Sequence, residues 1–155
     1  MNRFWGTGVA LVTPFNSNGT IDYDGLKKLI DYTIQGGVEY LVSLGTTGET
    51  ATLDKGERKA IFDFTVDTVA GRVPLVAGIG GNSTRDVSET LKSFDPTGFD
   101  AILSVSPYYN KPAQEGIYAH YKAIAEASPL PIILYNVPGR TGSNMTAETT
   151  LRLAH

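Results

Sequence analysis

Threonine, tyrosine and arginine side chains follow the predicted strands of this chain, and their chemistry suits a small anionic ligand. The candidates are Thr46 and Thr47 in GTTGE, Tyr109 in SPYYNKP, and Tyr135 and Arg140 in YNVPGRTG. Glycines at a strand-to-helix turn let backbone amides approach a carboxylate or phosphate, and threonine hydroxyls add donors. A phenol can relay protons, and a guanidinium pairs with a carboxylate through two hydrogen bonds. The set predicts carboxylate binding with proton transfer, although it contains no strong nucleophile and no electron sink.

Each candidate also has a plainer explanation when it is taken alone. The GTTGE stretch can be an ordinary turn in which a threonine acts as a cap. Tyr108, Tyr109 and Tyr135 can be packing or interface residues. Arg140 can be a solvated loop arginine. The case for a site is that the candidates follow three different predicted strands, because ligands of parallel α/β proteins lie at the carboxyl ends of the strands.

The histidine and cysteine content argues against two other kinds of site. The chain has no cysteine and two histidines, His120 inside a predicted helix and His155 at the last position. Neither a zinc site nor a histidine-based triad is therefore expected. We predict no metal and no other cofactor.

Length and composition indicate one globular domain covering residues 1–155. Of these residues, 41% are hydrophobic and 19% are charged, and the formal net charge is −3. This balance favours neither nucleic acid nor an anionic membrane as a partner. The apolar stretch from Gly8 to Phe15 is too short to span a bilayer and lacks signal-peptide features. With no cysteine present, we expect a cytoplasmic protein.

Aliphatic runs and helical patterns alternate along the chain. Asp54 and Glu57 have capping-box spacing at the start of one predicted helix. The last aliphatic run is expected to be a buried strand that leads into a loop fixed by Pro138 and Gly139. Strands are predicted at residues 9–12, 40–44, 73–77, 99–105 and 132–134, and two of the later helices carry the apolar stripes Val87, Leu91, Phe94 and Ile117, Tyr121, Ile124.

Two parallel α/β architectures fit this alternation, a doubly wound open sheet and a (β/α)8 TIM barrel. The first strand leads into Thr13 and Pro14, not into the glycine motif of a dinucleotide site. Polar or glycine residues follow all five predicted strands, as in a barrel that gathers ligand groups from many strand ends. We therefore predict a partial barrel of about five βα units, because a closed barrel needs about 200 residues or more.

Four stretches carry a resemblance to a known family: GTGVALVTPF, GTTGET, SPYYNKP and YNVPGRTG. With them the chain resembles the dihydrodipicolinate synthase branch of the N-acetylneuraminate lyase superfamily. The resemblance implies a TIM-barrel lyase that condenses pyruvate with aspartate semialdehyde on the diaminopimelate route to lysine. It also implies a homo-oligomer, a dimer or tetramer at full length, and a Schiff base on a lysine of the sixth strand. We expect this chain to stop before that strand and to be inactive alone.

The resemblance also implies roles for individual residues. Thr46 and Thr47 are similar to the residues that hold the pyruvate carboxylate, and Thr46 also belongs to a proton relay. Tyr135 resembles the main acid-base group, and Tyr109 resembles a relay tyrosine that reaches a neighbouring subunit's site. Arg140 resembles the arginine that receives the carboxylate of the aldehyde substrate.

A regulatory region is implied in the same way. Lysine feedback in the family uses a region that would include Thr50, Ala51, Asn82, Asp86 and Tyr108, of which Tyr108 resembles an interface residue. Lys55 and Arg58 occupy places where inhibited members often carry histidines, which argues against such feedback here.

Alternative functions remain open from the residues alone. One is another lyase of the superfamily, acting on N-acetylneuraminate or a keto-sugar acid. A second is a non-catalytic partial-barrel module whose open edge strands pair with another chain. Lys111, in the loop after the tyrosines, is not expected to form an imine, because such a lysine needs an apolar site.

Overall fold

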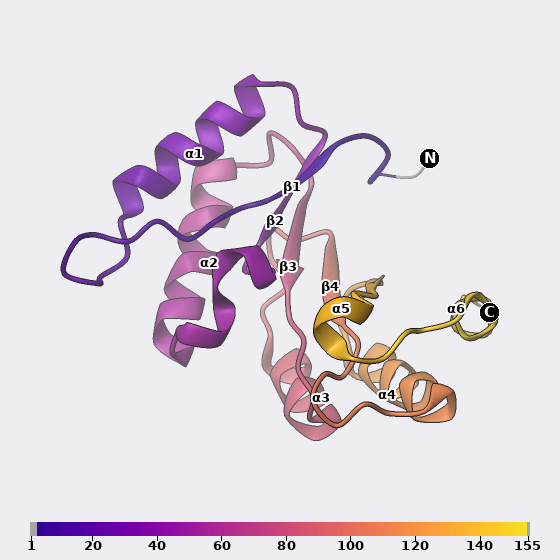
Figure 1. Cartoon of the computed structure of the whole chain (residues 1–155). Coiled ribbons are helices and arrows are strands. Elements are labelled where there is room, and N and C mark those ends of the chain that lie inside the picture. The colour runs from indigo at the N-terminus through magenta and orange to yellow at the C-terminus, as the bar shows by residue number, and fades with distance from the viewer. Residues whose placement is uncertain (1–2, 155) are drawn as a thin grey trace. The chain divides into compact units, whose positions relative to one another are not determined.

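The structure is a computed structural model that describes residues 3–154. It forms two compact units: the first runs to Gly78 and includes Thr97–Ala101, and the second contains Ile79–Pro96 and the segment from Ile102 onward. Strands and helices alternate along the chain in both units (Figure 1). This alternation confirms the predicted α/β class, whereas the prediction of a single domain stays a prediction.

Three short parallel strands form the core of the first unit. They are β1 (Gly8–Ala10), β2 (Tyr40–Ser43) and β3 (Leu75–Gly78). Val42 is paired with Val76 in the β2 and β3 register. β2 and β3 are almost wholly buried, as expected for parallel strands covered on both faces. Burial on both faces explains why both strands consist mostly of apolar residues.

The two helices of the first unit, α1 (Tyr23–Gln35) and α2 (Lys55–Val69), begin at acidic caps. The carboxylate of Asp22 accepts a 2.8 Å hydrogen bond from the backbone amide of Gly25. At α2 the predicted capping box is confirmed, because Asp54 and Glu57 each accept a hydrogen bond from the other's backbone amide.

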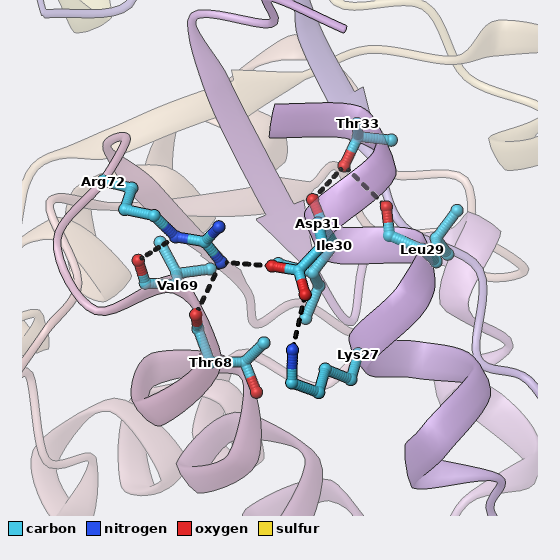
Figure 2. A network of polar contacts seen from close by, with 8 residues as sticks. All are labelled: Lys27, Leu29, Ile30, Asp31, Thr33, Thr68, Val69 and Arg72. Atoms are coloured by element: carbon cyan, nitrogen blue, oxygen red, sulfur yellow. Dashed lines mark hydrogen bonds and ion pairs between the residues drawn. The ribbon is translucent and has the colours of Figure 1, made fainter. Parts of the chain in front are cut away.

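Arg72, just after α2, joins the two helices (Figure 2). Its Nη2 lies 2.7 Å from Oδ1 of Asp31 on α1 and 2.7 Å from the carbonyl oxygen of Thr68. The other carboxylate oxygen of Asp31 lies 2.6 Å from Nζ of Lys27. Hydrogen bonds from Lys27 and then Arg72 lower the pKa of the Asp31 carboxyl. The network lies at the surface, so water and salt screen it.

The second unit pairs β4 (Ala101–Val105) with β5 (Ile132–Tyr135) in parallel, and the last register pair is Val105 with Tyr135. On α4 the predicted stripe of Ile117, Tyr121 and Ile124 is confirmed, since all three side chains are buried. The helices of this unit are α3 (Thr84–Ser93), α4 (Gln114–Ala127), α5 (Pro138–Thr141) and α6 (Ala147–Leu153). Within the first unit the strands follow the order β1-β2-β3, and within the second β4 is followed by β5.

Three local expectations differ from the structure. The strand predicted as buried, β5, is half-buried along its length, because it is the last strand in the sheet order. The segment Pro138–Thr141 is a short helix and not a loop, since proline suits the first helical position. α3 ends at Ser93, so Phe94 lies beyond the apolar stripe of Val87 and Leu91. Within residues 3–154, no helix has the length and apolar character to cross a membrane.

Candidate active site

The GTTGE stretch forms a compact pair of turns after β2 in the first unit. Two short 3-10 helices, Thr46–Gly48 and Thr50–Thr52, follow one another. Thr46 and Thr47 are exposed on the first of them. Asp54, and not a threonine of this stretch, caps α2. The structure thus leaves the side chains of Thr46 and Thr47 on the surface of a turn, where a ligand can reach them.

Buried contacts hold this turn against the end of β1. The hydroxyl of Thr13 is 5% exposed and donates a 2.7 Å hydrogen bond to the carbonyl of Gly48. Thr50 donates to the carbonyls of Leu44 and Gly45 at 2.7 and 2.9 Å. Because these three bonds fix backbone atoms close to Thr46 and Thr47, the turn is a firm support for their side chains.

A close approach from β3 adds to this support. A Cβ atom on Gly78 would lie 2.2 Å from the carbonyl oxygen of Leu44, so only glycine fits there. Leu44 itself has a left-handed backbone, with φ of 55°. A non-glycine residue in this conformation costs about 1 kcal/mol or more, which the surrounding contacts must offset.

In the second unit, Tyr135 ends β5 and is half-buried. Its carbonyl accepts a 3.0 Å hydrogen bond from the backbone amide of Ser106. The next residue, Asn136, anchors the following loop: its Nδ2 donates to Oδ1 of Asn144 at 2.7 Å, and its Oδ1 accepts from the amide of Met145 at 3.0 Å. These contacts hold the backbone of Tyr135 on both sides.

Arg140 lies on α5, directly after this strand, and is exposed. It is placed in the last turn of a helix of four residues that begins at Pro138. The helix ends at Gly142, which has φ of 67°. This arrangement holds the backbone of Arg140 and leaves the residue exposed.

The loop after β4 carries Tyr108 and Tyr109, which are 41% and 88% exposed. Tyr109 has a left-handed backbone, with φ of 70°. Nδ2 of Asn110 donates a 3.2 Å hydrogen bond to the carbonyl of Asn82, so Asn82 and this loop lie together. Asp86 lies in the first turn of α3.

The loops after β4 and β5 are joined to one another. Ser143 donates to the carbonyl of Pro112 at 3.2 Å, and Nε2 of Gln114 donates to the carbonyl of Asn144 at 2.7 Å. Lys111 crosses Gly142 so closely that an added Cβ would lie 2.8 Å from its Cε. These contacts join the loop that bears the tyrosines to the segment that follows the helix of Arg140.

The predicted site residues thus form two groups. Thr46, Thr47, Thr50 and Ala51 lie together in the first unit, and Tyr108, Tyr109, Tyr135, Arg140, Asn82 and Asp86 belong to the second. That the two groups meet in one site stays a prediction. Three residues that support these groups, Thr13, Gln114 and Ser143, had no predicted role in the site, because a single polar side chain is a weak signal in a sequence.

His120 is a buried residue of α4 and has a structural environment. Its Nδ1 lies 2.8 Å from Oγ1 of Thr84 on α3, and its ring is 3% exposed. Burial lowers the pKa of His120, which favours the neutral ring. Across the described part of the chain, no three histidine or acidic side chains are grouped as a metal site would need. His155 lies outside the described residues.

Parallel βα units whose strand-end loops carry the polar candidates define an α/β barrel-type protein. The chain belongs to the Dihydrodipicolinate synthetase family, whose model matches residues 3–155.

Relatives and solved structures agree with this assignment. The chain is 63% identical over 149 residues to the 4-hydroxy-tetrahydrodipicolinate synthase of Parabacteroides distasonis, covering 96% of the chain and 50% of that protein. It superposes on the chloride-inhibited dihydrodipicolinate synthase of Acinetobacter baumannii complexed with pyruvate, with a TM-score of 0.94, 47% identity and coverage of 98% and 52%.

It also matches the synthase of Cyanidioschyzon merolae with lysine bound, with a TM-score of 0.91, 45% identity and coverage of 99% and 53%. The chain spans about half the length of the relatives that it matches. These matches confirm the predicted fold class, a partial (β/α)8 TIM barrel.

Proposed function

We propose that this chain belongs to a lyase that condenses pyruvate with aspartate semialdehyde in the biosynthesis of lysine, a 4-hydroxy-tetrahydrodipicolinate synthase. The observation that carries the proposal is 63% identity over 149 residues to a protein of that name. The four sequence stretches that gave the resemblance lie within residues 3–155, which the family model matches. The direct test is condensation by the full-length protein with both substrates supplied.

Thr46 and Thr47 are proposed to hold the carboxylate of pyruvate. Both are exposed on a turn whose backbone carbonyls accept hydrogen bonds from Thr13 and Thr50. Hydroxyl and amide donors at such a turn suit a carboxylate. The relative from Acinetobacter baumannii was solved with pyruvate, which supports this substrate for our protein.

Tyr135, Tyr109 and Thr46 are proposed to move protons, with Tyr135 as the main acid-base group. A positioned general acid or base typically contributes a factor of about 100 to 10,000 in rate. Tyr109 is 88% exposed, so its phenol is free to reach into a neighbouring subunit, as the proposed relay requires. Arg140 is proposed to bind the carboxylate of the aldehyde substrate through two hydrogen bonds from its guanidinium.

The imine-forming lysine is proposed to lie outside this chain. All seven lysines of the chain are exposed, and six of them are on helices. An imine-forming lysine needs an apolar, water-excluded site, and an exposed position does not provide one. We therefore propose that the 155-residue chain alone does not condense the substrates.

Borohydride reduction in the presence of pyruvate, followed by intact mass analysis, tests the missing nucleophile. The full-length protein should gain a trapped adduct, and the 155-residue chain should not. An adduct on Lys111 or any other lysine of this chain would overturn the proposal.

Partners, location and regulation follow from the same family. We propose a homo-oligomer, a dimer or tetramer when full length, with Tyr108 at an interface, in the cytoplasm. A regulatory lysine site would draw on Thr50, Ala51, Asn82, Asp86 and Tyr108. The relative from Cyanidioschyzon merolae was solved with lysine, which supports such a site in the family.

Two other functions compete with the synthase. A lyase for N-acetylneuraminate or a keto-sugar acid would act without the aldehyde carboxylate contact that Arg140 is proposed to make, so substrate preference of the full-length protein separates the two. A non-catalytic assembly module would give oligomers of the 155-residue chain, which light scattering detects.

A further inference from the structure

Tyr121 brings a buried hydroxyl from α4 to the ends of two strands. Its side chain is 1% exposed and lies in the apolar stripe with Ile117 and Ile124. The hydroxyl donates a 2.9 Å hydrogen bond to the carbonyl of Ser104 on β4, and it lies 3.4 Å from the carbonyl oxygen of Tyr135 on β5. The polar tip of this residue therefore contacts both strands near their carboxyl ends.

The carbonyl of Tyr135 is the point where β5 leaves the sheet. It also accepts the backbone amide of Ser106 at 3.0 Å, beyond the last register pair of Val105 and Tyr135. One residue later, the side chain of Asn136 bonds to the loop at Asn144 and Met145. The orientation of this one peptide group thus depends on contacts from β4 and α4.

We infer that Tyr121 is a positioning residue for Tyr135, an inference that rests on the proposed function, in which Tyr135 is the acid-base group. The plane of the Tyr135 peptide sets the direction of its Cα–Cβ bond, and that direction places the phenol. Proton transfer requires the phenol within about 2.6 to 3.2 Å of the atom that it serves. A misplacement of about 1 Å can cost about 100-fold in rate.

The hydroxyl of Tyr121 contributes hydrogen bonds in addition to filling space. A phenylalanine would fill the same volume without the cost of burying a polar group, which only hydrogen bonds offset. Burial raises the pKa of Tyr121, so the group keeps its proton and remains a donor. Its neighbour His120 is directed elsewhere, toward Thr84 on α3.

The test compares Tyr121→Phe with Tyr118→Phe in the full-length protein. Tyr118 is a matched control, because it lies on the same helix and its ring faces the guanidinium of Arg152 at 4.4 Å. For Tyr121→Phe we expect kcat to fall about tenfold, the KM for pyruvate to stay within about twofold, and the pH profile of kcat to move. Tyr118→Phe should leave all three unchanged.

Stability and amide exchange separate positioning from folding. Thermal unfolding shows whether Tyr121→Phe remains folded at the assay temperature, and exchange of the Ser106 amide reports on the bond to Tyr135. We expect the Ser106 amide to exchange faster in Tyr121→Phe than in the wild type, whether or not this variant is also less stable. In Tyr118→Phe the exchange rate should equal that of the wild type.

Three results would overturn the inference. They are unchanged kcat and pH profile in Tyr121→Phe, equal loss in both variants, and unchanged exchange at Ser106. Wild-type protein that does not condense the substrates would instead defeat the proposed function, and the inference with it.

Discussion

Thr13 and Gly48, 35 positions apart in the chain, are joined by a buried hydrogen bond of 2.7 Å from the threonine hydroxyl to the glycine carbonyl. The bond ties the segment after β1 to the turn that carries Thr46 and Thr47. Since Thr13 is 5% exposed, water does not readily replace the lost partner when the hydroxyl is removed. The turn that is proposed to hold pyruvate thus depends on a residue that need not touch it.

Thr13→Val is expected to weaken the use of pyruvate. Valine has nearly the same shape but leaves the Gly48 carbonyl unpaired, which costs about 1–3 kcal/mol and frees the turn. We predict a drop of about tenfold in kcat/KM for pyruvate in the full-length protein. Thr13→Ser, which keeps the hydroxyl, should stay close to wild type. Initial rates at varied pyruvate concentration give kcat/KM for each variant. Equal kcat/KM values for the valine and serine variants would contradict the prediction.

Arg140→Lys is expected to impair the aldehyde substrate and spare pyruvate. Lysine keeps the charge but loses the planar pair of donors that fits a carboxylate. We predict a rise of about tenfold or more in the KM for aspartate semialdehyde, with the KM for pyruvate nearly unchanged. Arg85→Lys, an exposed site on α3, is the control. A similar rise in both KM values would point to a general disturbance of the site.

Asp31→Asn is expected to lower stability in a manner that depends on pH. The pKa of Asp31 is lowered from the ordinary value of 3.8 by Lys27 and Arg72, so the folded state favours the carboxylate. This stabilisation is present above the unfolded pKa and is lost as the pH falls through the lower folded pKa. Urea unfolding at pH 6 should show the variant to be less stable.

The difference should shrink as the pH falls well below 3.8. Added salt should also reduce it, because the ion pairs of Asp31 lie at the surface. Asp63→Asn, which removes a pair with Lys59 inside α2, should have a smaller effect, since no second helix is involved. A pH-independent difference would show that the ion pairs are not its cause.

Gly78→Ala is expected to destabilise the first unit. The added Cβ would lie 2.2 Å from the carbonyl oxygen of Leu44, a backbone atom that cannot move aside cheaply. We predict a loss of about 3 kcal/mol in the free energy of unfolding. Gly139→Ala is the matched control, because no heavy atom lies within 4 Å of its added Cβ. Thermal or urea unfolding of the two variants provides the comparison, and equal stability would refute the steric account.

Lysine is expected to inhibit the full-length protein weakly. The reason is the family resemblance, which implies that Lys55 and Arg58 stand where inhibited members often carry histidines. Rates at increasing lysine concentration measure the effect in wild type. The double variant Lys55→His, Arg58→His should become more sensitive, whereas strong inhibition of the wild type would contradict the prediction.

Local patterns were sufficient for much of the architecture. The alternation of aliphatic runs with helical stripes predicted five βα units, and all five strands are present. The Asp54 and Glu57 capping box and the buried Tyr121 stripe were predictable because their partners lie three or four positions apart. The half-buried β5 was not predictable in the same way, since an aliphatic run does not show whether a neighbouring strand covers it.

Residue types and short spacings along the chain were enough to predict the βα order, the family resemblance and the candidate residues. Three further findings required the folded structure: Thr13 supports the Gly48 turn, Gly78 must lack a Cβ, and Tyr121 contacts the carbonyl of Tyr135. Those contacts join atoms 14 to 35 positions apart, and they exist only when strand register and helix packing bring the atoms within hydrogen-bond or van der Waals distance.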